Sequence, residues 1–209
     1  MRLLLFLAVI FLVTAPTRSS TEVITDRGFL VVDRPVSSGF ARGRTAKVDT
    51  IVFHSVFAEG TPDPYSVDAV LAVFKRLKVS AHYLIARDGV VYKLVSESNT
   101  SYHAGKSRMP APDGRAKTNS FTIGIELIGG YDDRFTEAQY QGLEQLLLDI
   151  RSRHQICQLV AHGEISGDRK TDPWNFDWIR LRGWLENWGP VAHCGGALFI
   201  LVSGTHCPS

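Results

Sequence analysis

Residues 50–55 read TIVFHS, a run of β-branched and aromatic residues that is apolar on both faces until His54. Such a run predicts a central β-strand that is covered on both sides. Residues 66–78, SVDAVLAVFKRLK, repeat apolar side chains at helical spacing behind Ser66, a favourable N-cap residue. A buried strand followed by an amphipathic helix is typical of a layered domain that mixes strands and helices.

Later segments extend this pattern. They are a hairpin over 80–95, a strand over 121–130, a helix capped by Thr136 and Gln139 up to about residue 154, a strand over 158–162 and a helix over 177–188. The strand over 121–130 alternates, so that Gly124 and Glu126 face away from Ile123, Ile125 and Leu127. We therefore expect an α/β fold, with helices flanking a central mixed β-sheet.

The first 20 residues place Arg2 before an apolar run from Leu3 to Val13, and small and polar residues follow. That order predicts a secretory signal peptide, because the run is too short to span a bilayer comfortably. An uncleaved N-terminal anchor is the alternative. We expect an exported protein, periplasmic or secreted, with no stable membrane insertion after cleavage.

The chain has 23 basic and 21 acidic residues, and residues 1–20 contain two of the arginines and no acidic residue. The mature domain is thus close to neutral, which argues against a nucleic-acid partner.

The three cysteines are Cys157, Cys194 and Cys207. Export permits disulfides, so we expect a Cys194–Cys207 bridge to staple a C-terminal hairpin, and Cys157 to be a buried apolar residue. The pairs His193–Cys194 and His206–Cys207 leave metal binding as an alternative for the tail.

Three polar residues stand where a purely structural sequence would favour apolar types. His54 and His162 end apolar strands, and Glu126 lies within one. Asp172 lies near the end of the turn-rich stretch HGEISGDRKTDP, residues 162–173. Two imidazoles and one carboxylate supply the ligand count of a catalytic zinc ion, which keeps one position open. Glu126 would then be free to act as a base, and Lys170 to sit beside developing negative charge.

Other interpretations use the same residues. Each histidine alone suits a hydrogen-bonded core position, and Glu126 suits an edge strand that faces water. Two histidines and a carboxylate also form the facial triad of non-haem iron oxygenases. The chain contains no G-x-S-x-G and no H-E-x-x-H, which argues against a serine hydrolase elbow and a helix-borne metalloprotease site.

Five blocks in order resemble the type-2 N-acetylmuramoyl-L-alanine amidases, which are related to the peptidoglycan recognition proteins. The blocks are TIVFHS, SAHYLIARDGVVYKLV, YHAGKS, NSFTIGIEL and AHGEISGDRKTDP, and the resemblance covers roughly residues 48–188. It implies a zinc amidase with a central mixed sheet and one Zn2+ ion on the floor of a cleft. The implied ligands are His54, His162 and Asp172, with Glu126 as the base and Lys170 as the motif lysine.

The resemblance also implies the substrate, which is the amide between N-acetylmuramic acid and L-alanine in peptidoglycan or its fragments. His103 and Asn119 match family positions near the cleft and would contact the sugar or stem peptide, with loop-bracing hydrogen bonds as the alternative. Some relatives have a catalytic tyrosine where this chain has Ala81, which favours the route through Glu126. The alternative function is a non-catalytic muropeptide receptor with the same cleft.

These interpretations divide the chain into a signal peptide (1–20), an N-terminal arm (21–47), the amidase domain (48–188) and a C-terminal tail (189–209). We expect a monomer. The four tryptophans all follow position 173 and are expected in the core, without a role at the site.

Overall fold

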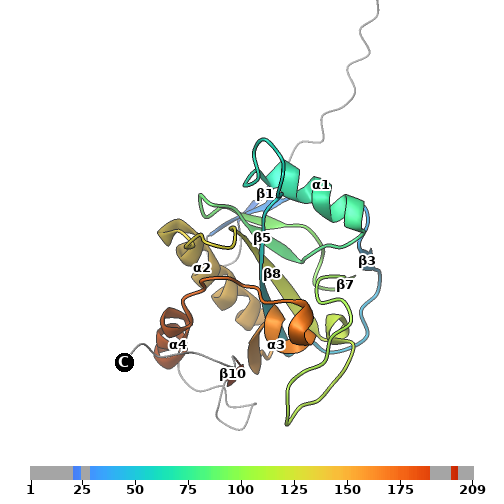
Figure 1. Cartoon of the computed structure of the whole chain (residues 1–209). Helices are drawn as coiled ribbons and strands as arrows, with labels where there is room; N and C mark the ends of the chain where they lie inside the picture. Colours follow the sequence, from blue (N-terminus) through green and yellow to red (C-terminus); the bar gives the residue numbers. More distant parts are fainter. Residues whose placement is uncertain (1–20, 25–28, 189–198, 202–209) are drawn as a thin grey trace, which may run out of the picture.

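The computed structural model describes residues 21–24, 29–188 and 199–201. An eight-stranded sheet crosses the domain in the order β1-β2-β6-β5-β8-β4-β9-β10 (Figure 1). Its strands are β1 (Thr21–Ile24), β2 (Leu30–Asp33), β4 (Thr50–Val56), β5 (Tyr83–Ile85), β6 (Val91–Lys93), β8 (Thr122–Ile128), β9 (Gln158–Ala161) and β10 (Phe199–Leu201). The β1–β2 and β5–β6 pairs are antiparallel, and the other pairs are parallel, so the predicted mixed sheet is confirmed.

Helices cover both faces of this sheet, as predicted. They are α1 (Val67–Leu77), α2 (Glu137–Arg153), α3 (His162–Ser166) and α4 (Trp178–Asn187), with 3-10 turns η1 (Thr118–Ser120) and η2 (Gly167–Arg169). A small second sheet pairs β3 (Phe40–Ala41) with β7 (Thr100–Ser101).

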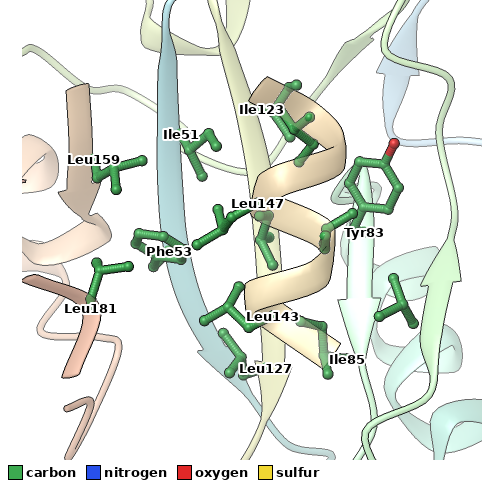
Figure 2. Close-up of a cluster of buried hydrophobic side chains, with 14 of the residues drawn as sticks. Ile51, Phe53, Tyr83, Ile85, Ile123, Leu127, Leu143, Leu147, Leu159 and Leu181 are labelled. Atoms are coloured by element: carbon green, nitrogen blue, oxygen red, sulfur yellow. The ribbon is translucent and has the colours of Figure 1, made fainter. Parts of the chain in front are cut away.

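The strand β4 is the centre of the core. Ile51 and Phe53 lie fully buried with Ile123 and Leu127 of β8, under Leu147 of α2 (Figure 2). On the opposite face, Val52 belongs to a second buried cluster with Ile165 of α3. Alternate residues of β4 therefore point to opposite sides, and His54 shares the face of Val52 rather than that of the main core.

The predicted helix boundaries are confirmed by their caps. The Ser66 side chain accepts from the backbone N–H of Ala69 to begin α1, and Thr136 and Gln139 form the expected capping box of α2. Gln139 also lies fully buried, and its Nε2 donates to the carbonyl oxygens of Ile85 and Ile128. One side chain thus joins α2 to the ends of β5 and β8.

The structure differs from the sequence-based expectation in three segments. The arm over 21–47 contributes β1 and β2 to the sheet rather than remaining a separate lead-in. The turn-rich stretch after β9 begins with the short helix α3 and the turn η2. The described part of the tail, β10, is a single strand parallel to β9, whereas a hairpin was expected.

Cys157 is half-buried and disulfide-bonded, so its interpretation as a buried apolar residue is wrong. Cys194 and Cys207 lie outside the described residues. The expected bridge between these two cysteines therefore stays a prediction. The predicted signal peptide over 1–20 also lies outside the described residues. Within the described part of the chain, no helix has the length and apolar character needed to cross a membrane.

Replacing Gln139 tests the link between α2 and the sheet. We expect Gln139→Leu to lower the free energy of unfolding by about 2 kcal/mol, because two buried carbonyl groups lose their donor. Gln141→Leu, on an exposed position of the same helix, should change it by less than about 0.5 kcal/mol. Denaturant unfolding measures both variants, and equal losses would contradict this role of Gln139.

Candidate metal centre

Three side chains from separate parts of the sequence meet beside the carboxyl ends of two neighbouring strands. His54 lies on β4, His162 follows β9 as the first residue of α3, and Asp172 lies in the loop after η2. Their ligand atoms all lie within 4.8 Å of one another. The Asp172 Oδ2 atom is 3.1 Å from His162 Nδ1 and 3.4 Å from His54 Nδ1. All three residues are buried.

The local backbone explains this convergence. Strands β4 and β9 pair in parallel, with Phe53 opposite Ala161, so the next residues, His54 and His162, leave the same edge. The Gly163 N–H then donates to the Asp172 carbonyl oxygen at 2.9 Å, and this bond holds Asp172 close to the end of β9. A Cβ atom on Gly163 would lie 3.2 Å from the Lys170 carbonyl oxygen, so this part of the loop is tightly packed.

A relay of hydrogen bonds assigns the tautomer of His54. The Thr122 hydroxyl donates to the Thr118 carbonyl oxygen at 2.8 Å, so it accepts from Nε2–H of His103 at 3.0 Å. Nδ1 of a neutral His103 is then an acceptor and takes the Nε2–H of His54 at 2.9 Å. This leaves a lone pair on His54 Nδ1, directed toward Asp172 and His162.

Burial supports neutral imidazoles in this relay. Burial, together with the neighbouring charge of His162, lowers the pKa of His54 to about 4. Burial also holds the pKa of His103 well below its ordinary value. Burial alone would raise the pKa of Asp172, but its hydrogen bonds with Nδ1 of His162 act in the opposite direction, and that pKa is lowered.

These protonation states place two electron-rich atoms, His54 Nδ1 and Asp172 Oδ2, face to face in a buried setting. Such an arrangement is unfavourable unless a cation lies between the two atoms. Two imidazole nitrogens and a carboxylate oxygen are suitable donors for a divalent transition-metal ion. The residues present therefore fit a metal ion.

Glu126 lies next to this group, paired in register with His54 on the adjacent strand. It is 8 % exposed, and its Oε2 atom has no hydrogen-bond partner among the described residues. Burial and then the negative charge of Asp172 raise its pKa well above the ordinary value, and Lys170 acts in the opposite direction. A buried carboxyl group that is not used for structure is available for chemistry.

A pocket of about 450 Å3 joins these groups. The three ligand candidates, Glu126 and Lys170 all line it. The structure therefore brings together, in one pocket, the five residues that the sequence predicts as ligands, base and motif lysine. Their roles remain proposals.

The structure places His103 and Asn119 mainly as supports. Both ring nitrogens of His103 are used by His54 and Thr122. The Asn119 Oδ1 atom accepts from the backbone N–H groups of His103 and Ala104, at 3.2 and 2.8 Å. This is the loop-bracing alternative. Contact of either residue with substrate stays an untested prediction.

Glycine is required where His103 packs on β8. A Cβ atom at Gly124 would lie 2.4 Å from the His103 ring. A larger residue at this position would therefore displace the imidazole that supports His54.

An aromatic wall of the pocket was missed by the sequence-based interpretation. Trp174 and Tyr131 line the pocket with ring centroids 4.4 Å apart, and Trp174 Nε1 donates to Thr171 Oγ1 at 3.0 Å. The expectation that all four tryptophans belong to the core is thus wrong for Trp174, although Trp178, Trp184 and Trp188 do pack there. The sequence signal that indicates a place for Trp174 at the site is its position two residues after Asp172.

Comparison with known proteins gives evidence on the family of this chain that is independent of the geometry of the site. The family model described as N-acetylmuramoyl-L-alanine amidase matches residues 44–175. The chain is 34% identical over 179 residues to the 1,6-anhydro-N-acetylmuramyl-L-alanine amidase AmpD of Salmonella typhimurium, covering 77% of this chain and 94% of that protein. It is 39% identical over 128 residues to AmpD of Haemophilus influenzae, covering 59% and 67%.

Solved structures of similar fold point to the same group of proteins. A selenomethionine derivative of AmpD has a TM-score of 0.62 and 31% identity, over 78% of this chain and 99% of that one. The amidase AmiD of E. coli, solved with anhydro-N-acetylmuramic acid-L-Ala-D-gamma-Glu-L-Lys, has a TM-score of 0.57 and 28% identity, over 70% and 65%. A Drosophila peptidoglycan recognition protein shares the fold, with a TM-score of 0.51 and 16% identity over 71% of this chain and 86% of that one. The chain therefore belongs to the N-acetylmuramoyl-L-alanine amidase family, and the enzyme class that its sequence blocks predict is confirmed.

Proposed function

We propose that this protein hydrolyses the amide bond between N-acetylmuramic acid and L-alanine in peptidoglycan fragments, with one zinc ion held by His54, His162 and Asp172. The observation that carries the proposal is the meeting of these three donors in one pocket beside the unpartnered carboxyl group of Glu126. The names of the relatives and the anhydro-muropeptide in the AmiD structure support this substrate class.

Zinc, when bound, supplies a Lewis acid that polarises the amide carbonyl and acidifies water at neutral pH. Glu126 takes the proton of the attacking water and passes it to the leaving alanine nitrogen. The ammonium group of Lys170 stabilises the oxyanion that develops on the carbonyl oxygen. His103 holds His54 in the tautomer that leaves the lone pair of Nδ1 free, so that this atom could bind a metal ion, as outer partners of metal ligands commonly arrange.

A muropeptide receptor with the same cleft is the second candidate. A receptor needs the pocket but has no use for a buried, unpartnered carboxyl group next to three ligands. The presence of Glu126 therefore favours the enzyme.

We also propose that the enzyme is exported. The residue pattern of 1–20 predicts a signal peptide. The disulfide at Cys157 supports an oxidising compartment, because such bonds are rare where thiols are kept reduced.

Removal of one ligand tests the metal site. The purified protein should retain one zinc ion per chain after dialysis, whereas Asp172→Ala should weaken zinc binding by more than about 100-fold. Asp168→Ala, four residues earlier and exposed on η2, is the matched control and should bind zinc like the parent. Elemental analysis by mass spectrometry reads the outcome. Zinc in Asp172→Ala at the parent's stoichiometry and affinity would contradict the ligand set, and iron in place of zinc would favour the oxygenase interpretation.

The catalytic roles are tested by turnover. We expect Glu126→Gln to lower kcat on an anhydro-muropeptide by at least about 100-fold while the bound zinc remains. Lys170→Ala should cost about 100-fold through the lost oxyanion contact. Mass spectrometry of the released stem peptide, with and without chelator, measures both effects. Tight binding without release by the zinc-loaded parent would instead identify a receptor, and full turnover by Glu126→Gln would exclude its role as the base.

The raised pKa of Glu126 predicts a pH dependence of stability in the metal-free protein. A carboxyl group with a raised folded-state pKa stabilises the fold below its unfolded pKa near 4.5, and this contribution is lost as the pH rises. The side chain of Glu126→Gln stays neutral at every pH. Above pH 4.5, the free energy of unfolding of this variant minus that of the parent should therefore increase with pH, by at most about 1.4 kcal/mol per pH unit. Denaturant unfolding at a series of pH values measures the difference. A difference that does not change with pH would show that burial does not hold this carboxyl group neutral.

A further inference from the structure

The wall formed by Tyr131 and Trp174 is part of a larger aromatic cluster at the rim of the metal pocket. The Tyr131 ring centroid lies 4.4 Å from that of Trp174 and 5.2 Å from that of Phe57. The centroids of Phe57 and Tyr65 are 6.5 Å apart. The four residues come from three separate loops, after β4, after β8 and before α4. We call them the aromatic platform.

The aromatic platform extends from the pocket onto the outer surface. Tyr131 and Trp174 line the metal pocket, whereas Phe57 and Tyr65 are not among its lining residues. Tyr131 is 54 % exposed and Tyr65 is 39 % exposed. Such rings contribute little to the core, and neighbouring exposed aromatic side chains are typical of a binding surface.

Hydrogen bonds hold two loops of the aromatic platform in place. The Asn175 side chain donates to the carbonyl oxygens of Tyr131 and Asp133, at 2.8 and 3.1 Å, and thereby joins the loop after β8 to the loop before α4. The Trp174 N–H donates to Ser55 Oγ on β4 at 3.1 Å. Aromatic rings on braced loops lose little conformational entropy when a ligand packs on them.

Carboxylates flank the aromatic platform. Glu59 and Asp63 lie in the loop after β4, Asp132 lies in the loop after β8, and all three are exposed. One cation also contacts it, since the guanidinium carbon of Arg87 lies 5.8 Å from the Tyr65 ring centroid. Carboxylate oxygens accept hydrogen bonds from hydroxyl groups and repel other carboxylates. These surroundings suit a neutral ligand that is rich in hydroxyl groups better than an acidic peptide.

We propose that the aromatic platform binds the sugar next to the reacting N-acetylmuramic acid residue in a glycan strand. This inference rests on the proposed function, which places that residue in the metal pocket. A pyranose ring presents C–H groups on its faces and hydroxyl groups along its edge. The C–H groups pack on the electron-rich faces of aromatic rings, and the hydroxyl groups donate to carboxylates.

The position of the platform suits this neighbouring sugar. The muramic acid residue is held near the metal ligands by its scissile amide, so the next sugar of the strand leaves the pocket at its rim. Tyr131 and Trp174 lie on that rim, and Phe57 and Tyr65 continue the surface outward. A glycan strand, or a disaccharide fragment of it, is therefore a better substrate than a fragment with a single sugar.

A pair of substrates that differ by one sugar tests this inference. One is the anhydro-muramoyl tripeptide, and the other carries N-acetylglucosamine on the same muramoyl residue. The zinc-loaded parent should cleave the disaccharide substrate with a kcat/KM about 10-fold higher, because one more sugar is bound. In Tyr131→Ala this preference should fall to about 2-fold or less, whereas Tyr131→Phe keeps the ring and should retain it.

The ratio of the two kcat/KM values is the quantity to compare, because a loss of folded or zinc-loaded enzyme lowers both values alike. Ile179→Ala is the matched control, since Ile179 is 73 % exposed on α4 and does not line the pocket, and it should keep the preference of the parent. An equal loss on both substrates in Tyr131→Ala would contradict the proposal, because the ring would then contact the muramoyl residue or the stem peptide. A parent without any preference would contradict it as well.

Binding of a glycan that carries no stem peptide separates the platform from the amidase activity. NMR titration of the peptide-free disaccharide into the zinc-loaded parent should show binding, and Tyr131→Ala should weaken it about 10-fold. If the parent cleaves neither tripeptide substrate but shows this difference in binding, the aromatic platform stands and the amidase proposal fails. If the parent cleaves both substrates equally and Tyr131→Ala leaves disaccharide binding unchanged, the amidase stands and the aromatic platform is wrong.

Discussion

The parallel pairing of β4 with β8 on one side and β9 on the other is the constraint on which the site depends. In this register His54 lies opposite Glu126, and Phe53 lies opposite Ala161, so His162 leaves the sheet at the same edge. A slip of one residue would turn His54 into the apolar core and Phe53 into the pocket. Burial of Ile51 and Phe53 under α2 therefore fixes the register, and the register determines which side chains meet in the pocket.

The second constraint is electrostatic. The relay from Thr118 through Thr122 and His103 leaves His54 with a lone pair that faces the carboxylate of Asp172. Without a cation these atoms repel, and the same burial raises the pKa of Glu126 well above its ordinary value. A bound divalent ion would relieve the first conflict and favour the ionised form of Glu126. The fold thus holds residues whose mutual repulsion a bound metal ion would relieve, and such local conflict is typical of functional sites.

Much of this was predictable from patterns within single segments. An apolar run predicted β4, alternation predicted β8, and helical spacing predicted α1 and α2, whose caps marked where the helices begin. His54, His162 and Glu126 stood out because each interrupts an apolar run. Features set by tertiary contact were missed. The sequence predicts Trp174 in the core because composition does not show that its loop returns to the pocket. Strands β1 and β2 belong to the sheet because β2 pairs with β6, a segment distant in the sequence. The disulfide at Cys157 likewise depends on which segments approach it.

Zinc K-edge X-ray absorption of the zinc-loaded protein tests the central claim most directly. The account predicts a first shell of nitrogen and oxygen donors at about 2.0–2.2 Å with the outer-shell scattering of two imidazole rings. That imidazole signal should fall to one ring in His54→Ala. A shell that contains sulfur at about 2.3 Å would place the ion on cysteines instead. An imidazole signal that His54→Ala leaves unchanged would contradict the convergence of His54, His162 and Asp172 on one ion.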